Sequence, residues 1–233
     1  MPLIELRNVT KSYRSGQVSI TALDGVSLEI EPGKFTVILG PSGSGKSTLL
    51  NLIGGMDFVT SGEIMIDGVH IEKLSKEKLT KYRRESIGFI FQFYNLIPNL
   101  TCYENVDIAS RLSTDPLDAE AVLETLGLGK RFRNFPAQLS GGEQQRASIA
   151  RALCKNPKIM LCDEPTGALD TQTGSHVLSY LQNMAKQYRK AVIVVTHNES
   201  AATAADRLIR LKDGRIDSIS DNPAPEIIGK AVT

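Results

Sequence analysis

The sequence has almost no net charge: 27 lysine and arginine residues stand against 26 aspartate and glutamate residues, which leaves a formal charge of +1 at pH 7. This balance gives no overall positive field that would attract nucleic acid or an anionic membrane surface. We therefore expect no nucleic-acid partner. Hydrophobic residues make up 41% of the 233 residues and charged residues 23%, which is ordinary for a globular protein that buries a sizeable core.

Long hydrophobic runs and disulfide-forming cysteine patterns are also missing. No apolar run approaches the ~18 residues of a transmembrane helix, and the N-terminus lacks the basic-then-apolar pattern of a secretory signal. The three cysteines, Cys102, Cys154 and Cys162, are odd in number and lack metal-ligand spacing, so they are predicted to be reduced thiols that fill the core. We expect a cytoplasmic protein that reaches a membrane only through a partner.

A phosphate-binding loop dominates what is present. Residues 40–48 fit the pattern G-x-x-x-x-G-K-[ST] and lie between a predicted buried strand, 35–39, and a predicted helix, 48–53, as this loop requires. Its glycines let successive N–H groups point at phosphate oxygens, beside the positive end of the helix. We expect Lys46 to reach the β- and γ-phosphates and Ser47 to bind Mg²⁺. The predicted nucleotide-binding residues here are Gly40, Pro41, Ser42, Gly43, Ser44, Gly45, Lys46, Ser47 and Thr48.

The remaining patterns predict an α/β chain. Half-buried strands over 3–9 and 26–30 form an antiparallel region that leads into 35–39, with a polar loop at 11–16 between them. A hairpin is expected where 207–211 and 215–219 flank Asp213-Gly214. The other predicted strands are 62–68, 86–91, 191–195 and an apolar run within 158–165. The other predicted helices are 76–84, 147–153, 171–188 and two segments within 103–126. Residues 221–233 are predicted to form a tail.

Polar side chains follow three of the predicted buried strands. Gln92 comes after 86–91, Asp163 and Glu164 end the run of the next strand, and His197 follows 191–195. Ligands of open parallel sheets gather at the carboxyl ends of the strands. A P-loop enzyme places its Mg²⁺-organising aspartate where Asp163 stands, and Glu164 can accept a proton from a water molecule. Taken alone, Gln92 is only a loop glutamine and His197 a core or capping histidine.

The segment 139–146, Leu-Ser-Gly-Gly-Glu-Gln-Gln-Arg, precedes a strongly helical run. Ser140 and Glu143 are spaced as a capping box. Capping does not explain Gly141 and Gly142, because glycine is a poor residue for a first helical turn unless something approaches the backbone closely; free N–H groups at a helix start bind anions. Tyr13, in the predicted polar loop, favours a packing or surface role when it is considered alone.

In order and spacing, these motifs resemble the nucleotide-binding subunits of ABC transporters over nearly the whole chain. The match includes the run Asp-Glu-Pro-Thr-Gly-Ala-Leu-Asp at 163–170. Two small departures are Glu143, where glutamine is commoner in the signature, and Cys162 in Walker B; neither removes a ligand. The resemblance implies Walker A at 40–48, the Q-loop glutamine Gln92, the signature at 139–146, Walker B at 159–163, the catalytic glutamate Glu164, the D-loop aspartate Asp170, the switch histidine His197, and Tyr13 as the aromatic residue that stacks on adenine.

The resemblance implies a P-loop NTPase fold of ABC type: a mostly parallel core sheet, an N-terminal antiparallel β-subdomain and an α-helical signature lobe. A single domain over 1–233 would have its core at about 1–90 and 157–220, its lobe at about 93–156 and its tail at 221–233. ATP and Mg²⁺ are the expected cofactors, with Ser47, Gln92 and Asp163 holding the metal. Ser140, Gly141 and Gly142 would act on the nucleotide of a second copy of the chain, and Asp170 is a further expected nucleotide-binding residue.

Within the family, the motifs resemble the branch that serves lipoprotein release, macrolide efflux and resistance to antimicrobial peptides. An integral-membrane permease is then the expected partner, and the subunit would lie at the inner face of the membrane. The same residues fit a regulatory ATPase of the cell-division type, which moves a membrane partner without carrying a solute. A nucleic-acid-associated ATPase is disfavoured by the single cassette and the balanced charge, and a non-hydrolysing module by Glu164 and His197.

Overall fold

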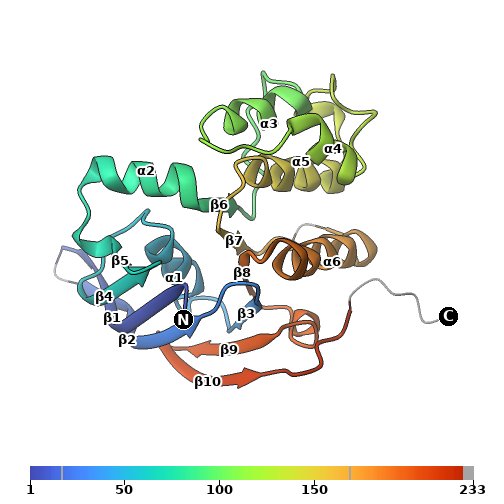
Figure 1. Cartoon of the computed structure of the whole chain (residues 1–233). Coiled ribbons are helices and arrows are strands. Elements are labelled where there is room, and N and C mark those ends of the chain that lie inside the picture. The colour runs from blue at the N-terminus through green and yellow to red at the C-terminus, as the bar shows by residue number, and fades with distance from the viewer. Residues whose placement is uncertain (17, 168, 228–233) are drawn as a thin grey trace.

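The computed structural model describes residues 1–16, 18–167 and 169–227 (Figure 1). Its larger sheet has six strands in the order β10-β9-β3-β8-β7-β6. Neighbouring strands from β9 to β6 are parallel, and the edge pair β9–β10 is an antiparallel hairpin. The predicted, mostly parallel core sheet is therefore confirmed. The strands are β3 (Phe35–Leu39), β6 (Ile87–Ile90), β7 (Ile159–Asp163), β8 (Ala191–Thr196), β9 (Arg207–Lys212) and β10 (Arg215–Asp221).

The second sheet is the predicted antiparallel region, in the order β2-β1-β4-β5. Its strands are β1 (Ile4–Ser15), β2 (Val18–Ile30), β4 (Ser61–Ile66) and β5 (Val69–His70). The prediction of a polar loop at 11–16 was wrong, because β1 continues through this segment to Ser15. Register shifts between Leu6 and Ser12 interrupt the regular pairing of β1 with β2, and the first four residues of β2 are exposed. A strand pair with these features shows no apolar period in the sequence.

The helices cover both faces of the core sheet and form a separate cluster above it (Figure 1). Helices α3, α4 and α5 make up this cluster, which is the predicted helical lobe. Asp115-Pro116 lies between α3 and α4 and so separates the two helical segments predicted within 103–126, and α6 spans its predicted range, 171–188. The α-helices are α1 (Lys46–Ile53), α2 (Lys76–Ser86), α3 (Cys102–Ser110), α4 (Ala119–Thr125), α5 (Gly141–Leu153) and α6 (Thr171–Tyr188); the short 3₁₀ helices are η1 (Ile71–Lys73), η2 (Pro136–Gln138) and η3 (Glu199–Ala201).

The period of two along each strand divides the core into two layers. Val37 and Met160 pack in one hydrophobic cluster with α6 and the lobe. The residues that follow them, Ile38 and Leu161, point the other way and pack with α1 and the antiparallel sheet. Helix α1 is therefore fixed against one face of the sheet and α6 against the other. This arrangement sets the positions of the loops at the carboxyl ends of the strands.

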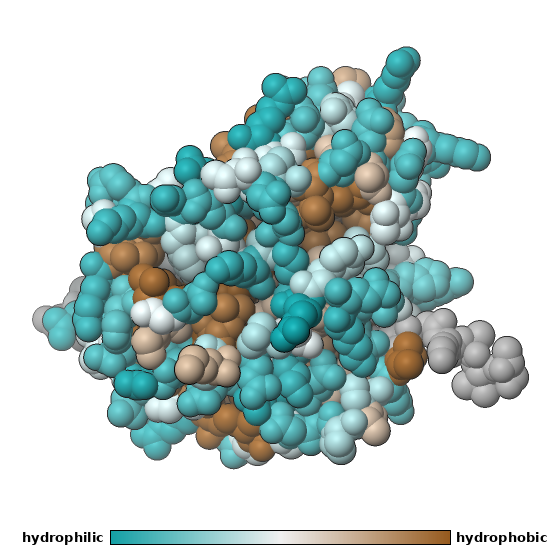
Figure 2. Space-filling model, viewed as in Figure 1, coloured by the Kyte–Doolittle hydropathy of each residue, from teal (hydrophilic) through white to brown (hydrophobic). Residues whose placement is uncertain are grey.

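The three cysteines are free and buried, as predicted. Burial raises the pKa of Cys102 to about 11 and that of Cys154 to about 12, so both thiols stay protonated at neutral pH. No helix in the described part of the chain is long and apolar enough to cross a membrane. The face seen in Figure 2 is mostly hydrophilic, with apolar residues in separate patches.

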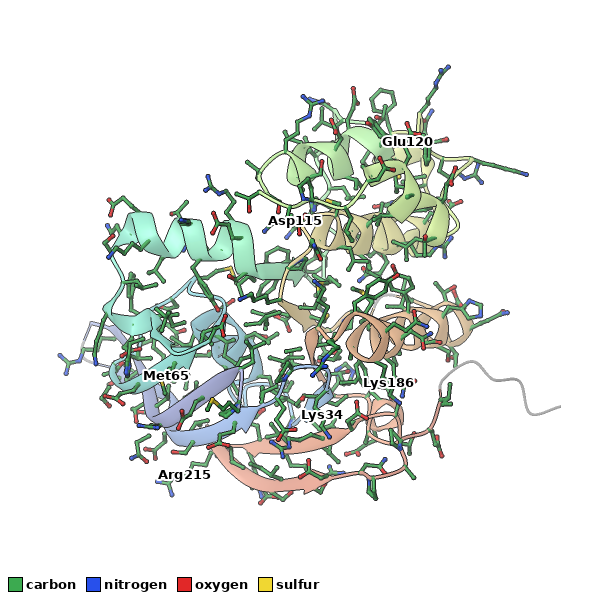
Figure 3. The ribbon with its side chains drawn as sticks, viewed as in Figure 1. Lys34, Met65, Asp115, Glu120, Lys186 and Arg215 are labelled. Atoms are coloured by element: carbon green, nitrogen blue, oxygen red, sulfur yellow. The ribbon has the colours of Figure 1, made fainter. Side chains whose placement is uncertain are left out.

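The segment after β10 packs back onto the fold in its described part. Gln182, buried on α6, donates from Nε2 to the carbonyls of Ala204 and Glu226 at 2.9 and 2.7 Å. The remainder of the predicted tail, 228–233, and Ala168 of the 163–170 run lie outside the described residues. On the lobe, Glu120 points away from the sheets (Figure 3). Asp115 is exposed, and its Oδ2 accepts a hydrogen bond from Asn156 Nδ2 at 3.1 Å.

Candidate active site

A cavity of about 590 Å³ lies at the carboxyl ends of the parallel strands, within the size range of small-molecule sites. It combines residues from β2, from the P-loop and the start of α1, and from the segments that follow β6, β7 and β8. The six residues with predicted catalytic or metal-binding roles all line this cavity, and their roles stay predictions; they are Lys46, Ser47, Gln92, Asp163, Glu164 and His197. The lining residues are Ala22, Ser42, Gly43, Gly45, Lys46, Ser47, Thr48, Gln92, Asp163, Glu164 and His197.

Two positions of the P-loop require glycine, because the backbone of another strand passes close to each of them. A Cβ atom on Gly40 would lie 2.2 Å from the carbonyl oxygen of Leu211, and one on Gly45 would lie 2.3 Å from that of Ala22. Gly45 also has φ of +100°, which disfavours residues with a side chain. It precedes α1 without any side-chain cap. The first N–H groups of α1 therefore remain available to an anion.

Polar groups that suit phosphate lie within this loop. The Lys46 side chain is mostly buried, and its Nζ donates to the carbonyls of Gly40 and Pro41 at 2.8 and 2.9 Å. The hydroxyl of Ser44 is buried and has no hydrogen-bond partner among the described residues. A buried hydroxyl is normally satisfied. The loop thus offers an ammonium group, an unpaired hydroxyl and uncapped N–H groups, which is a donor set suited to a polyphosphate.

Asp163 and Ser47 form the part of the site that suits a hard cation. Ser47 Oγ donates to Asp163 Oδ1 at 3.1 Å. Burial and the neighbouring Glu164 carboxylate raise the pKa of Asp163, while the hydrogen bond from Ser47 opposes this rise. Gln92 lines the same cavity. No group of three histidine, cysteine or acidic residues that could hold a metal occurs in the described ranges. The set of one carboxylate, one hydroxyl and one amide fits Mg²⁺, which keeps waters and uses substrate phosphates as ligands.

Glu164 is held by the last residue of β8 and by the residue that follows it. Its Oε2 accepts a hydrogen bond from Thr196 Oγ1 at 2.9 Å, and its Oε1 lies 2.9 Å from His197 Nδ1. The Thr196 hydroxyl accepts from the N–H of Asn198 at 3.0 Å, so its proton points to Glu164. Glu164 itself has φ of +47°, an uncommon conformation for a residue with a side chain. The motifs did not identify Thr196, although it is the last polar residue of a strand beside β7.

The signature residues and Asp170 do not line this cavity. Ser140 caps α5 through the predicted capping box, with Ser140 Oγ accepting from Glu143 N at 3.3 Å and Glu143 Oε2 accepting from Ser140 N at 2.8 Å. A Cβ atom on Gly142 would lie 2.7 Å from Cγ2 of Thr173. Asp170 caps α6, since its Oδ1 accepts from Thr173 N at 3.0 Å. These residues thus have structural roles within one chain, apart from the P-loop.

Tyr13 lies next to the cavity without lining it. Its side chain is 42% exposed on β1, and its hydroxyl donates to Asp57 Oδ2 at 2.9 Å. Burial raises the pKa of Tyr13 and Asp57 adds to the rise, while the side chain of Thr48, a cavity residue, opposes it. The ring is therefore placed beside the start of α1.

Comparison with known proteins agrees with the motifs and the fold. The model of a family described as ABC transporter matches residues 23–167. An uncharacterized ABC transporter ATP-binding protein of Methanocaldococcus jannaschii, MJ0796, is 47% identical over 224 residues, which are 92% of this chain and 95% of that protein. Its dimeric structure in a post-hydrolysis state, bound to ADP and Pi, superimposes with a TM-score of 0.86 at 44% identity and covers 94% of this chain and 98% of that chain.

Two relatives are longer than this chain. The macrolide export ATP-binding/permease protein MacB of Brucella melitensis is 44% identical over 97% of the chain, which spans 35% of that protein. The putative ABC transporter ATP-binding protein MG065 of Mycoplasma genitalium is 45% identical over 96% of the chain, which spans about half, 49%, of its length. The macrolide-export relative agrees with the predicted branch. The family model matches more than half of the chain, and the fold superimposes on that of MJ0796. The chain therefore belongs to the ABC transporter family, as one of its ATP-binding domains.

Proposed function

We propose that this chain binds and hydrolyses ATP at the cavity beside the P-loop and uses the reaction to drive a membrane permease. The observation that carries the proposal is the meeting of Glu164 and His197 with Lys46 and Ser47 in one cavity. The phosphates would lie against the P-loop amides and Lys46. A Mg²⁺ ion held by Ser47, Gln92 and Asp163 would supply positive charge to the phosphate oxygens.

Glu164 is the residue that would act as the base. With Oε2 fixed by Thr196 and Oε1 beside His197, its carboxylate can hold one water molecule in a single orientation. The water oxygen forms a bond to the γ-phosphorus, the bond from phosphorus to the ADP oxygen breaks, and the water proton goes to Glu164. His197 would contact the γ-phosphate. Catalysis of this kind depends mainly on positioning and electrostatics.

The signature residues would serve a second copy of the chain. Ser140, Gly141 and Gly142 lie at the start of α5 in the lobe, and Asp170 starts α6. None of them lines the cavity of the same chain. When two copies associate, these helix starts would complete the site of the partner, and ATP would hold the two copies together. The dimeric relative bound to ADP and Pi supports this arrangement.

Two variants test the chemistry. Glu164→Gln should bind ATP, hydrolyse it about 10²–10⁴-fold more slowly because the base is lost, and form a dimer that size-exclusion chromatography with light scattering detects only with MgATP. Lys46→Ala should lose nucleotide binding or turnover. Lys34→Ala, which changes a half-buried lysine just before β3 and outside the cavity, is the control and should behave like wild type. Unchanged turnover in Lys46→Ala, or a Glu164→Gln protein that stays monomeric at high protein and MgATP concentrations, would contradict the proposal.

The permease is proposed from the longer relatives, one of which carries the word permease in its name. Phe93 supports a contact next to the site, because it directly follows Gln92 and its side chain is 76% exposed. Vesicles that contain the membrane protein encoded beside this chain should stimulate its ATPase activity. Phe93→Ser should lose the stimulation but keep the basal rate, whereas Ile219→Ser, on exposed β10, should keep both. A stimulated Phe93→Ser protein would argue against this surface.

A further inference from the structure

Tyr13 is held by two charged residues that the motifs did not identify. Its hydroxyl donates to Asp57 Oδ2 at 2.9 Å, and Lys11 Nζ donates to the other oxygen of the same carboxylate, Oδ1, at 2.6 Å. The same ammonium group lies over the Tyr13 ring, 4.7 Å from its centroid. Lys11 and Tyr13 both contact the Asp57 carboxylate, so their side chains lie on the same side of β1. Three side chains thus form a closed cluster.

The cluster is partly buried and fully paired. The Lys11 side chain is 11% exposed and that of Asp57 28%. Lys11 Nζ also donates to the carbonyl of Phe58 at 2.7 Å, and the N–H of Phe58 donates to Asp57 Oδ1 at 2.7 Å. Burial raises the pKa of Asp57, but the hydrogen bonds from Lys11, Phe58 and Tyr13 outweigh it, so the pKa lies below its ordinary value. A charge pair held this way resists displacement, because breaking it leaves a buried charge unpaired.

The segment that carries Asp57 connects the tyrosine to the phosphate-binding helix. It follows α1 directly, and the N–H of Met56 donates to the carbonyl of Asn51 at 2.9 Å. Three residues after Asp57, the N–H of Thr60 donates to the Thr10 carbonyl of β1 at 2.8 Å. The position of Asp57 therefore depends on α1 on one side and on β1 on the other. Through Asp57, the ring is fixed relative to the helix whose N-terminus faces the cavity.

We propose that Lys11 and Asp57 are positioning residues that hold Tyr13 as a platform for the purine base of the bound nucleotide. The inference rests on the proposed function, because it assumes that a nucleotide occupies the cavity. One face of the ring is covered by the ammonium group of Lys11, so the base stacks on the other. A cation on one face draws electron density from the ring, which favours contact with an electron-rich purine on the opposite face. The hydrogen bond to Asp57 fixes the tilt of the ring.

The base and the phosphates can be separated experimentally. MgATP has both, whereas Mg-tripolyphosphate has only the phosphate chain. For Asp57→Asn and for Tyr13→Phe we expect KM for ATP to rise about threefold to tenfold, a part of the roughly 5- to 150-fold that a whole base–aromatic stack provides. The kcat at saturating ATP, and the affinity for tripolyphosphate, should change less than about twofold, since neither reports on the base.

A control variant and a second substitution distinguish a local effect on Tyr13 from a general loss of folding. Asp67→Asn breaks an exposed ion pair with Lys158 at 2.5 Å, in the turn between β4 and β5, and should leave KM unchanged. If Asp57→Asn does not fold because Lys11 loses its partner, Tyr13→Phe decides, since it keeps the Lys11–Asp57 pair and removes only the hydroxyl. An unchanged KM for ATP in Tyr13→Phe, or an equal loss of ATP and tripolyphosphate affinity, would overturn the inference.

A spectroscopic measurement reports the stacking itself. The chain contains no tryptophan, so Tyr13→Trp introduces a single fluorophore at the platform. MgATP should quench it and Mg-tripolyphosphate should not; equal signals from both would place the base elsewhere. Failure of the proposed function would look different, because wild-type protein would then show no ATP hydrolysis and Lys46→Ala would change nothing.

Discussion

The signature glycine Gly142 provides the sharpest test of how the site is divided between two chains. Two explanations for this glycine make different predictions. Within the chain, a Cβ atom at this position would lie 2.7 Å from Thr173 Cγ2, so glycine is needed for packing. Between chains, the partner's nucleotide would approach the same backbone. A substitution that only lowers ATPase activity cannot separate the two.

The magnitude follows from the contact. Alanine at 142 must displace the methyl group of Thr173, and overpacking of this kind costs about 1–3 kcal/mol. Replacing glycine by alanine in a helix returns up to about 1 kcal/mol. We therefore expect Gly142→Ala to lower the free energy of unfolding by about 1 kcal/mol. Thr173→Ser removes only the clashing methyl group, so the double variant should regain the loss, with a coupling energy of about 1–2 kcal/mol.

Urea unfolding and steady-state ATPase assays on the four proteins of this cycle give the answer. We expect Gly142→Ala/Thr173→Ser to recover stability while its ATPase activity stays tenfold to a hundredfold low, on the order that a misplaced catalytic group costs. Gly129→Ala is the control, because its Cβ atom would meet only Glu124 Cγ at an ordinary 3.4 Å. Full recovery of activity in the double variant would refute the role in the partner's site, and unchanged stability of Gly142→Ala would refute the packing argument.

Three further outcomes follow from contacts of the lobe and α6. The Arg131 guanidinium and the backbone at the start of α5 hold the pKa of Glu143 at about 2. The contribution of Glu143 to stability is therefore full above its ordinary pKa and is lost as the pH falls from about 5 to about 2. Urea unfolding of Glu143→Gln should show a flatter pH dependence and converge with wild type near pH 2. Arg151→Lys cannot reproduce the two hydrogen bonds that the partly buried guanidinium donates to carbonyls of the loop after β6, and thermal unfolding should reveal a loss of about 1–3 kcal/mol. A change below about 0.5 kcal/mol would count against the role of this residue. Asp170→Ala should lose about 1 kcal/mol through the missing α6 cap, while Asp170→Asn should keep most of it in the same measurement.

Much of the fold could be predicted because its core strands are buried on both faces. Continuous apolar runs such as 35–39 and 191–195 predict buried strands even when the adjacent strands are unknown. The polar residues just after these runs indicated the edge of the sheet where the cavity lies. The end of the β1–β2 hairpin could not be predicted in this way. Its exposed residues bury no face, so their pairing depends on backbone hydrogen bonds that leave no trace in the pattern of residue types.

The candidate site was predicted where a motif carries its own geometry, as in residues 40–48, and missed where the geometry comes from distant segments. Asp57 is 44 residues from Tyr13, and Thr196 is 32 residues from Glu164. Neither contact has a characteristic spacing. The rule that polar residues gather at strand ends would have selected Thr196, since β8 is the direct neighbour of β7. No comparable rule identifies Asp57.

Thr173 connects the two elements that we assign to the partner's nucleotide. Its N–H is capped by Asp170 at 3.0 Å, and its methyl group fills the space beside Gly142. The start of α6 and the start of α5 are therefore packed against each other within one chain, before any second copy binds. A partner would meet a single preformed surface instead of two independent loops. Because association then orders few residues, more of the free energy of binding the shared nucleotide is available to hold the two chains together.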